Sequence, residues 1–254
     1  MLLAVDVGNS NVVFAALCDG EVVCRHRTET LRNGSREDYG AALQALLSTG
    51  KITAAELDGA ILSSVVPEAD EAIASAIMQQ TGLSCLQVSP AMKTGMPLRI
   101  DAPDTLADDI ICGCVGAVQL VKGPVAVVDM GTATTVVVVD RDGCYRGGAI
   151  MPGVKLSLRA LTAGTSLLPE MTVTAPGKVI ATETVESILS GSVYGTAAAI
   201  DGLVARMEEE LGYGLQIVAT GGLGSAVLPY CKRTVRYEAD LLFRGMAALY
   251  EMNT

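Results

Sequence analysis

The sequence is poor in aromatic residues and in histidine. It has no tryptophan, two phenylalanines and seven tyrosines among 254 residues, although half of its residues are hydrophobic. The interior must therefore be built from Val, Leu, Ile, Ala and Met, as in α/β proteins whose sheets are covered by helices. The single histidine, His26, falls within a strand pattern, so the sequence supports neither histidine acid–base catalysis nor a Ser-His-Asp or Cys-His nucleophile.

Positive charge is also scarce. There are 18 Lys and Arg residues against 28 Asp and Glu residues, which gives a formal net charge of -10. Nucleic acids and anionic membranes bind basic surfaces, so we expect neither as a partner. A small anionic nucleotide remains possible, because backbone N–H groups, a helix N-terminus and a metal ion can hold it.

The cysteines and the apolar runs exclude further classes of protein. The seven cysteines contain no Cys-x-x-Cys pair and lie mostly in apolar runs, which argues against zinc and against disulfides. The apolar residues 1–16 are interrupted by Asp6 and by Asn9–Asn11, and no basic segment precedes them, so a signal peptide is not expected. The apolar runs are far shorter than the ~18 residues of a membrane span. These patterns predict a cytoplasmic protein.

An internal repeat organises the chain. Superposing Asp6 on Asp129 also superposes Gly8 on Gly131 and Gly20 on Gly143, all at one offset of 123 residues. In each copy the Asp follows a predicted strand, and two further predicted strands follow it, at residues 2–7, 12–17 and 21–27 and again at 125–130, 134–140 and 144–150. This coincidence predicts two homologous halves.

The remaining elements complete an α/β pattern. We predict helices at residues 36–48, 67–80, 105–121, 184–211 and 241–252, and strands at 59–66 and 216–219. The helix at 105–121 joins the halves, so the predicted domains are residues 1–117 and 118–254. Since no low-complexity linker separates them, we expect the domains to pack closely around a central cleft, where ligands tend to bind.

The repeated Asp-x-Gly turns are the first candidate site. Gly8 lets the backbone approach a phosphate and present N–H donors to it, and the turn at residues 129–134 repeats the device with hydroxyls. Two facing turns of this kind could hold a cation and the charged tail of ATP. One such turn alone would more simply be a surface hairpin. A third glycine-rich element, Ala219–Gly224, is either a nucleotide contact or an ordinary strand-to-helix turn.

With histidine set aside, a carboxylate is the candidate general base. Acidic residues crowd the start of the connecting helix. Thr105–Asp108 has the form of a capping box, so Asp108 is either a helix cap or a site residue. Asp109 would point elsewhere, and in a cleft it could accept the proton of a substrate hydroxyl that attacks the γ-phosphate.

These residues belong to a set of motifs that resembles the type III pantothenate kinase family over nearly the whole chain. The set comprises Asp6–Asn11, Ser64–Pro67, Lys93–Gly95, Asp129–Thr135, Gly147–Gly153, Leu168-Pro169, Thr184–Ile188 with Ser190-Gly191, and Thr220–Gly222. The resemblance implies a duplicated ribonuclease H-like (actin-like ATPase) fold, usually dimeric, that phosphorylates the primary alcohol of pantothenate with ATP and Mg²⁺ as the first step toward coenzyme A.

The resemblance also implies roles for individual residues. Asp109 corresponds to the proton acceptor, Asp129 to a ligand of a monovalent cation such as K⁺ or NH₄⁺, and Thr184 to a substrate contact. The residues implied to bind ATP are Asp6, Val7, Gly8, Asn9, Ser10, Asn11, Val12, Val13 and Thr132.

The substrate loop departs from the family pattern. The usual Gly-Ala-Asp-Arg is here Ala107-Asp108-Asp109-Ile110, so the base is kept while the arginine is lost, and Ile100 replaces a usual tyrosine. Loss of a charge-assisted contact commonly costs about 1.5–3 kcal/mol. Two alternatives to pantothenate kinase activity therefore stay open: a kinase for another small alcohol, and a nucleotide-binding or regulatory homologue without catalysis.

Overall fold

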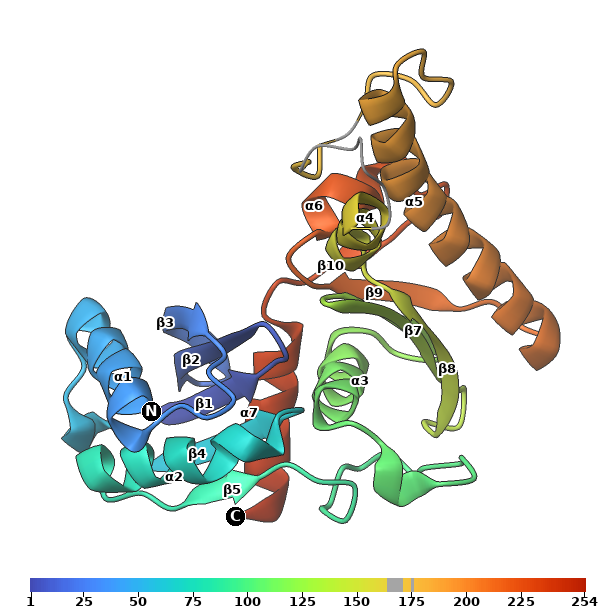
Figure 1. The fold of residues 1–254 in the computed structure, drawn as a ribbon. Coiled ribbons are helices and arrows are strands. Elements are labelled where there is room, and N and C mark those ends of the chain that lie inside the picture. The colour runs from blue at the N-terminus through green and yellow to red at the C-terminus, as the bar shows by residue number, and fades with distance from the viewer. Residues whose placement is uncertain (164–170, 175) are drawn as a thin grey trace. The chain divides into compact units, whose positions relative to one another are not determined.

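The computed structural model describes residues 1–163, 171–174 and 176–254, so the Leu168-Pro169 motif lies outside the described residues (Figure 1). The chain divides into two compact units. Unit 1 consists of Met1–Leu120 together with Asp240–Thr254, and unit 2 of Val121–Ala239. The last helix therefore belongs by its contacts to unit 1, although the division predicted from the repeat, at residues 117 and 118, had grouped it with the second half.

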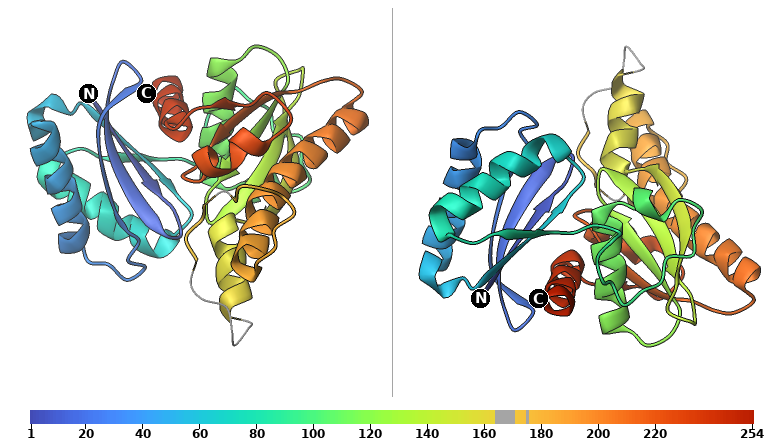
Figure 2. Two further views of the ribbon diagram at one scale, coloured as in Figure 1. Left: turned by 90° about the horizontal axis from the view of Figure 1, so that it is seen from above. Right: turned by 90° about the horizontal axis from the view of Figure 1, so that it is seen from below.

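Unit 1 is a mixed five-stranded sheet of order β3-β2-β1-β4-β5. Its strands are Leu2–Val7 (β1), Asn11–Cys18 (β2), Glu21–Glu29 (β3), Gly59–Ser64 (β4) and Cys85–Gln87 (β5). Its helices are Arg36–Gly50 (α1), Pro67–Thr81 (α2), Asp108–Leu120 (α3) and Leu241–Asn253 (α7), with short 3₁₀ turns at Ala54–Glu56 and Pro103–Thr105. The α1 and α2 helices cover one face of the sheet and α7 the other (Figure 2), which explains why the central strand β1 is almost wholly buried.

Unit 2 has the same plan, with a five-stranded sheet of order β10-β9-β6-β7-β8. Its strands are Val125–Met130 (β6), Ala133–Val139 (β7), Tyr145–Pro152 (β8), Gln216–Thr220 (β9) and Arg236–Tyr237 (β10). Its helices are Val154–Ala163 (α4), Thr184–Leu211 (α5) and Gly224–Val227 (α6), with a 3₁₀ turn at Leu228–Tyr230. The predicted strands and helices are confirmed with ends shifted by a few residues, whereas β5, β10 and α4 were not predicted.

The strand pairing confirms the duplication. In both units the first strand pairs antiparallel with the second and parallel with the fourth. The third strand carries a bulge at the equivalent place, since Val23 and Arg146 are each skipped in the pairing. One difference is local: Asp6 pairs with Val13 but Asp129 with Thr135, so the second Asp-x-Gly turn is one residue shorter.

Helix α5 is long and apolar enough to cross a membrane, judged by length and composition alone. Its most apolar window has a mean hydropathy of 1.3 and is 33% buried. Leu189, Ala197, Ile200 and Val204 of this helix belong to the core that also includes Val128 of β6. Core helices of soluble proteins pass the same test, so this finding is weak evidence for a membrane span.

Helices α3 and α7 approach one another backbone to backbone. A Cβ on Gly116 would collide with the carbonyl oxygen of Leu241, and a Cβ on Gly245 would collide with that of Cys112. Neither obstacle is the end of a flexible side chain, so neither can move aside cheaply. This reciprocal contact holds the helix that carries Asp108 and Asp109.

Gly116→Ala should therefore destabilise the chain although alanine favours helices. We expect overpacking to outweigh the gain in helix propensity and to lower the melting temperature by about 4–8 °C. The matched control is Gly195→Ala in α5, where a Cβ meets nothing within 4 Å. That change should raise the melting temperature by about 2–4 °C. Calorimetry measures the melting temperature of both variants. Equal effects of the two substitutions would contradict the packing argument.

Candidate functional site

The Asp-x-Gly turn of unit 1 is held in place from outside the turn. The Gly8 N–H donates to the Asn11 carbonyl (2.9 Å) and closes the turn between β1 and β2. Beyond β3, the Thr30 N–H donates to the Ser10 carbonyl (3.2 Å), and the Thr30 hydroxyl donates to the Gly8 carbonyl (2.6 Å). Asn9 and Ser10 remain exposed. The result is a fixed, polar and accessible turn at the end of the central strand.

Asp108 faces the end of β4. Its carboxylate accepts a hydrogen bond from the Ser64 N–H (3.4 Å) and another from the Gln87 side chain. The Thr105 hydroxyl donates instead to the Ala102 carbonyl (2.8 Å) within the short 3₁₀ turn that precedes α3. The predicted capping box is therefore replaced by a link between α3 and the sheet, which sequence spacing could not show because Ser64 and Gln87 are distant along the chain.

The Asp109 carboxylate lies at the same end of α3. It accepts a hydrogen bond from the Ile110 N–H (2.7 Å). Burial raises the pKa of Asp109, because a charged carboxylate loses hydration there. Ala107, Ile110 and Ile100 are each half-buried, and the Ala107 carbonyl accepts from the Ile111 N–H (3.2 Å) in the first turn of the helix.

A buried thiol on α3 lies within the electrostatic influence of three acidic residues. Cys112 lies one turn beyond Asp108 on α3, and the Ser63 hydroxyl of β4 contacts it. Burial raises the pKa of Cys112, and the negative charges of Asp6, Asp108 and Asp109 raise it further. Asp6, Asp109 and Ser63 of β4, all in unit 1, thus lie around the Cys112 thiol.

Asp108 is the carboxyl of α3 with the larger perturbation. Burial raises its pKa to about 6, and the negative charges of Asp109 and Asp70 add to the rise, while the bonds from Ser64 and Gln87 oppose it. Carboxyls with raised pKa values cluster at functional sites, although structural networks also produce them. A cluster of acidic side chains at the end of two strands can accept protons and repels free anions.

The corresponding turn of unit 2 holds Asp129 at the end of β6. The Gly131 N–H donates to the Ala133 carbonyl (2.9 Å), and the Gly153 N–H donates to the Thr132 carbonyl (3.0 Å). A Cβ on Gly153 would lie 2.5 Å from the carbonyl oxygens of both Gly131 and Thr132. Gly153 is thus required for the close approach of the chain to this turn.

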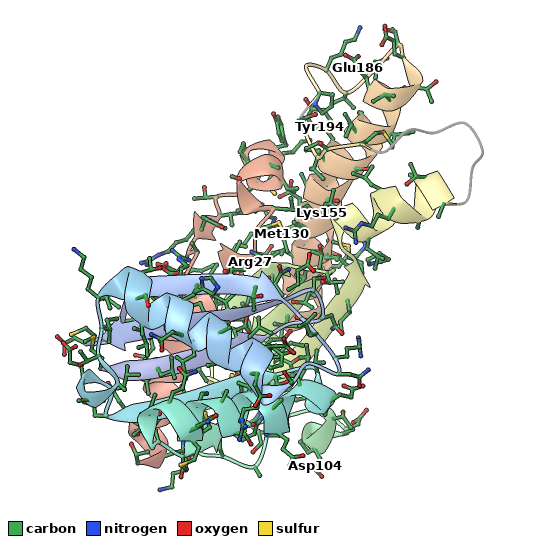
Figure 3. The ribbon with its side chains drawn as sticks, turned by 60° about the vertical axis from the view of Figure 1, so that its left-hand side comes forward. Arg27, Asp104, Met130, Lys155, Glu186 and Tyr194 are labelled. Atoms are coloured by element: carbon green, nitrogen blue, oxygen red, sulfur yellow. The ribbon has the colours of Figure 1, made fainter. Side chains whose placement is uncertain are left out.

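The glycine-rich segment after β9 has a structural explanation. Gly221 has a φ of +96°, and a Cβ there would lie 2.5 Å from the backbone nitrogen of Met130, which is labelled in Figure 3. The Tyr237 hydroxyl donates to the Gly221 carbonyl (3.1 Å).

Thr184, the predicted substrate contact, is exposed in the first turn of α5.

No group of three or more His, Cys, Asp or Glu side chains within residues 1–163, 171–174 and 176–254 is placed to hold a metal ion.

Comparisons with known proteins agree on one family. The sequence profile described as type III pantothenate kinase matches residues 2–206. Two similar relatives carry the same description: one from Moorella thermoacetica, 35% identical with all of both chains covered, and one from Bifidobacterium longum subsp. infantis, 36% identical with 100% of this chain and 99% of the relative covered.

Solved structures support the fold. A proposed 2-dehydro-3-deoxygalactonokinase from Sinorhizobium meliloti has a TM-score of 0.60 with 16% sequence identity, covering 99% of this chain and 96% of that chain. At this identity the likeness shows the fold alone, which is the duplicated α/β architecture of the actin-like ATPases.

The raised pKa of Asp108 predicts a pH-dependent gain in stability for Asp108→Asn. The folded carboxyl has a pKa of about 6, whereas an unfolded one has about 3.9. The folded chain therefore binds this proton more tightly and loses stability as the pH rises between these values, with no further loss above them. Asparagine can keep the bond from Ser64 without ionising.

At pH 7.5 we expect Asp108→Asn to be more stable than the wild type by about 1 kcal/mol, allowing for solvent screening of a half-exposed group. Below about pH 4 the difference should vanish. Urea unfolding at both pH values measures it. If the difference in the free energy of unfolding between the variant and the wild type is the same at both pH values, ionisation of Asp108 is not its cause.

Proposed function

Because the chain belongs to the type III pantothenate kinase family, whose members phosphorylate pantothenate with ATP in coenzyme A biosynthesis, we propose that Asp109 is the general base of this reaction. The observation that supports the role is the position of Asp109 at the start of α3, where its charge and that of Asp6 both act on the Cys112 thiol. Burial raises the pKa of Asp109, which makes its carboxylate a stronger base.

Besides a general base, phosphoryl transfer needs few chemical groups from the protein. Asp109 accepts the proton of the primary hydroxyl as that oxygen attacks the γ-phosphorus, and the bond from the γ-phosphorus to the β,γ-bridging oxygen breaks to release ADP. Phosphoryl transfer depends mainly on positioning and on stabilisation of charge. The link from Asp108 to Ser64 fixes the start of α3, and hence the place from which Asp109 acts.

ATP with a divalent metal is the phosphoryl donor of this family. We assign ATP binding to Asp6, Val7, Gly8, Asn9, Ser10, Asn11, Val12 and Val13, with Thr132 of unit 2 as a further nucleotide residue. The fixed turn and its exposed Asn9 and Ser10 support this assignment. Mg²⁺ would arrive with the nucleotide, since it binds substrate phosphates while keeping several of its waters.

The remaining roles are likewise proposals. Asp129 is assigned to a monovalent cation, K⁺ or NH₄⁺. Ala107, Asp108, Ile110 and Thr184 are assigned to the pantothenate site. Ile110 cannot form an ion pair with the pantothenate carboxylate, so the substrate must be held by hydrogen bonds and apolar contact at this position.

We further propose a cytoplasmic homodimer that binds neither nucleic acid nor membrane. The acidic balance of the sequence supports the absence of polyanionic partners. Leu156, Leu161, Ile180 and Val185 of unit 2 are exposed apolar side chains that an interface between copies would bury.

Asp109→Asn should strongly lower the turnover rate without preventing nucleotide binding. Removing a general base typically costs about 10²- to 10⁴-fold in rate. The assay follows ADP together with phosphorylated pantothenate, with Mg-ATP and K⁺ present. The matched control is Asp104→Asn, the same change at an exposed acidic residue of the preceding 3₁₀ turn (Figure 3), which should leave the rate within about twofold because surface changes are usually small.

Other outcomes would favour the alternatives. Turnover with a different small alcohol but not with pantothenate would indicate an altered substrate, consistent with Ile100 and Ile110. Nucleotide binding without turnover on any alcohol would indicate a regulatory homologue. A rate in Asp109→Asn equal to that of the wild type would remove Asp109 from the mechanism.

The cation assignment predicts that replacing K⁺ by Na⁺ lowers the rate in the wild type. Asp129→Asn should lower the rate in K⁺ and make the two salts equivalent. Rates at matched ionic strength measure both effects. Equal wild-type rates in the two salts would count against a selective cation site at Asp129.

A further inference from the structure

The segment that follows β3 lies directly over the Asp-x-Gly turn of unit 1. Both hydrogen bonds of Thr30 end on carbonyls of this turn, those of Gly8 and Ser10. The next residue, Leu31, exchanges hydrogen bonds with the buried Tyr39, whose hydroxyl donates to the Leu31 carbonyl (2.6 Å) and accepts from the Leu31 N–H (3.2 Å). The backbone at Arg32 is thus anchored on its N-terminal side, next to the turn.

Arg32 extends toward the turn from this anchored position. Its Nη2 donates to Oδ1 of Asn9 (3.0 Å), in the middle of the turn. Its Nη1 lies 3.6 Å from Oε1 of Glu68, with the two side chains 56% and 55% exposed. An ion pair this long and this exposed contributes little to stability, so Arg32 can exchange it for a better anion at small cost.

The start of α2 lies beside the same turn. The Val65 N–H donates to the Val7 carbonyl (3.0 Å), which ties the chain just before α2 to the end of β1. Val66 at the N-cap offers no side-chain hydrogen bond to the first turn, and Glu68 stands within that turn. The positive end of a helix and a guanidinium therefore approach the turn together, and both favour a phosphate.

The contrast with Arg36 is informative. Arg36 stands four residues further along, and its guanidinium pairs with its own neighbour Glu37 at 2.7 Å. Of these two arginines, it is Arg32 that reaches across to Asn9, a residue proposed to bind ATP. In a chain with a net charge of -10, a positive side chain at this place is a specific feature rather than part of a general basic surface.

We propose that Arg32 binds the phosphate chain of ATP, releasing Glu68 as the nucleotide enters. The guanidinium can donate two parallel N–H bonds to phosphate oxygens, and its bond to Asn9 already places it beside the turn. Glu68 then acts as the counter-charge of Arg32 in the absence of nucleotide. This inference rests on the proposed use of residues 6–13 for ATP.

Calorimetric titration with the magnesium complex of a non-hydrolysable ATP analogue, and separately with AMP, tests the proposal. Arg32→Gln should weaken binding of the analogue about 10- to 50-fold, the loss of a charge-assisted contact. Binding of AMP should change by less than about twofold, because AMP lacks the outer phosphates that Arg32 contacts. Arg32→Lys should recover part of the loss as a point charge without the fork.

Two control variants separate direct contact from other effects. Arg36→Gln removes the same charge nearby and should leave the affinity within about twofold, since exposed charges are screened. Glu68→Gln should bind the analogue at least as tightly as the wild type. If Arg36→Gln or Glu68→Gln weakens binding of the analogue as much as Arg32→Gln does, the proposed direct contact between Arg32 and the phosphates is contradicted.

The titration also distinguishes this proposal from the proposed function. A wild-type chain that binds no analogue would overturn the nucleotide role of the turn and Arg32 with it. If the wild type and Arg32→Gln bind the analogue with equal affinity, the role of Arg32 alone is overturned. Turnover of pantothenate, followed separately, decides the proposed reaction.

Discussion

The backbone contact between α3 and α7 is the constraint on which the site of unit 1 depends. Gly116 and Gly245 allow the two helices to approach until side chains no longer separate them. Helix α7 also packs on the sheet that carries β1 and β4. The N-terminus of α3 is therefore placed relative to the ends of these strands, and the link from Asp108 to Ser64 fixes it there. Asp109 follows Asp108 directly, so its position is a consequence of helix packing.

The two units use one sheet plan for different turns. In unit 1 the turn after the first strand carries amide and hydroxyl side chains, and Thr30 holds it from the end of β3. In unit 2 the turn is a residue shorter, and Gly153, just after β8, approaches it so closely that only glycine fits. The two turns share a backbone plan but differ in their side chains, which is consistent with different ligands. We propose that the turn of unit 1 binds the nucleotide and that Asp129 binds a monovalent cation.

Local pattern was sufficient to predict most of the fold. Apolar strands with glycine turns at a constant offset predicted the meanders, and helical spacing predicted α1, α2, α5 and α7 within a few residues. The short strands β5 and β10 have too few residues for a pattern, and their existence depends on neighbouring strands. The role of Asp108 was also beyond prediction, because a capping box and a bond to Ser64 use the same residue and only tertiary packing decides between them. Arg32 was missed because its partners Asn9 and Glu68 are distant in sequence.

The central claim is that Asp109 lies where it can take the proton of the reacting hydroxyl. The most direct measurement is a crystal structure of the wild-type chain with pantothenate and the magnesium complex of a non-hydrolysable ATP analogue. The account predicts a carboxylate oxygen of Asp109 at about 2.6–3.2 Å from the primary hydroxyl oxygen of pantothenate. A hydroxyl bonded to a different group, with Asp109 too far away for one water molecule to bridge the gap, would contradict it.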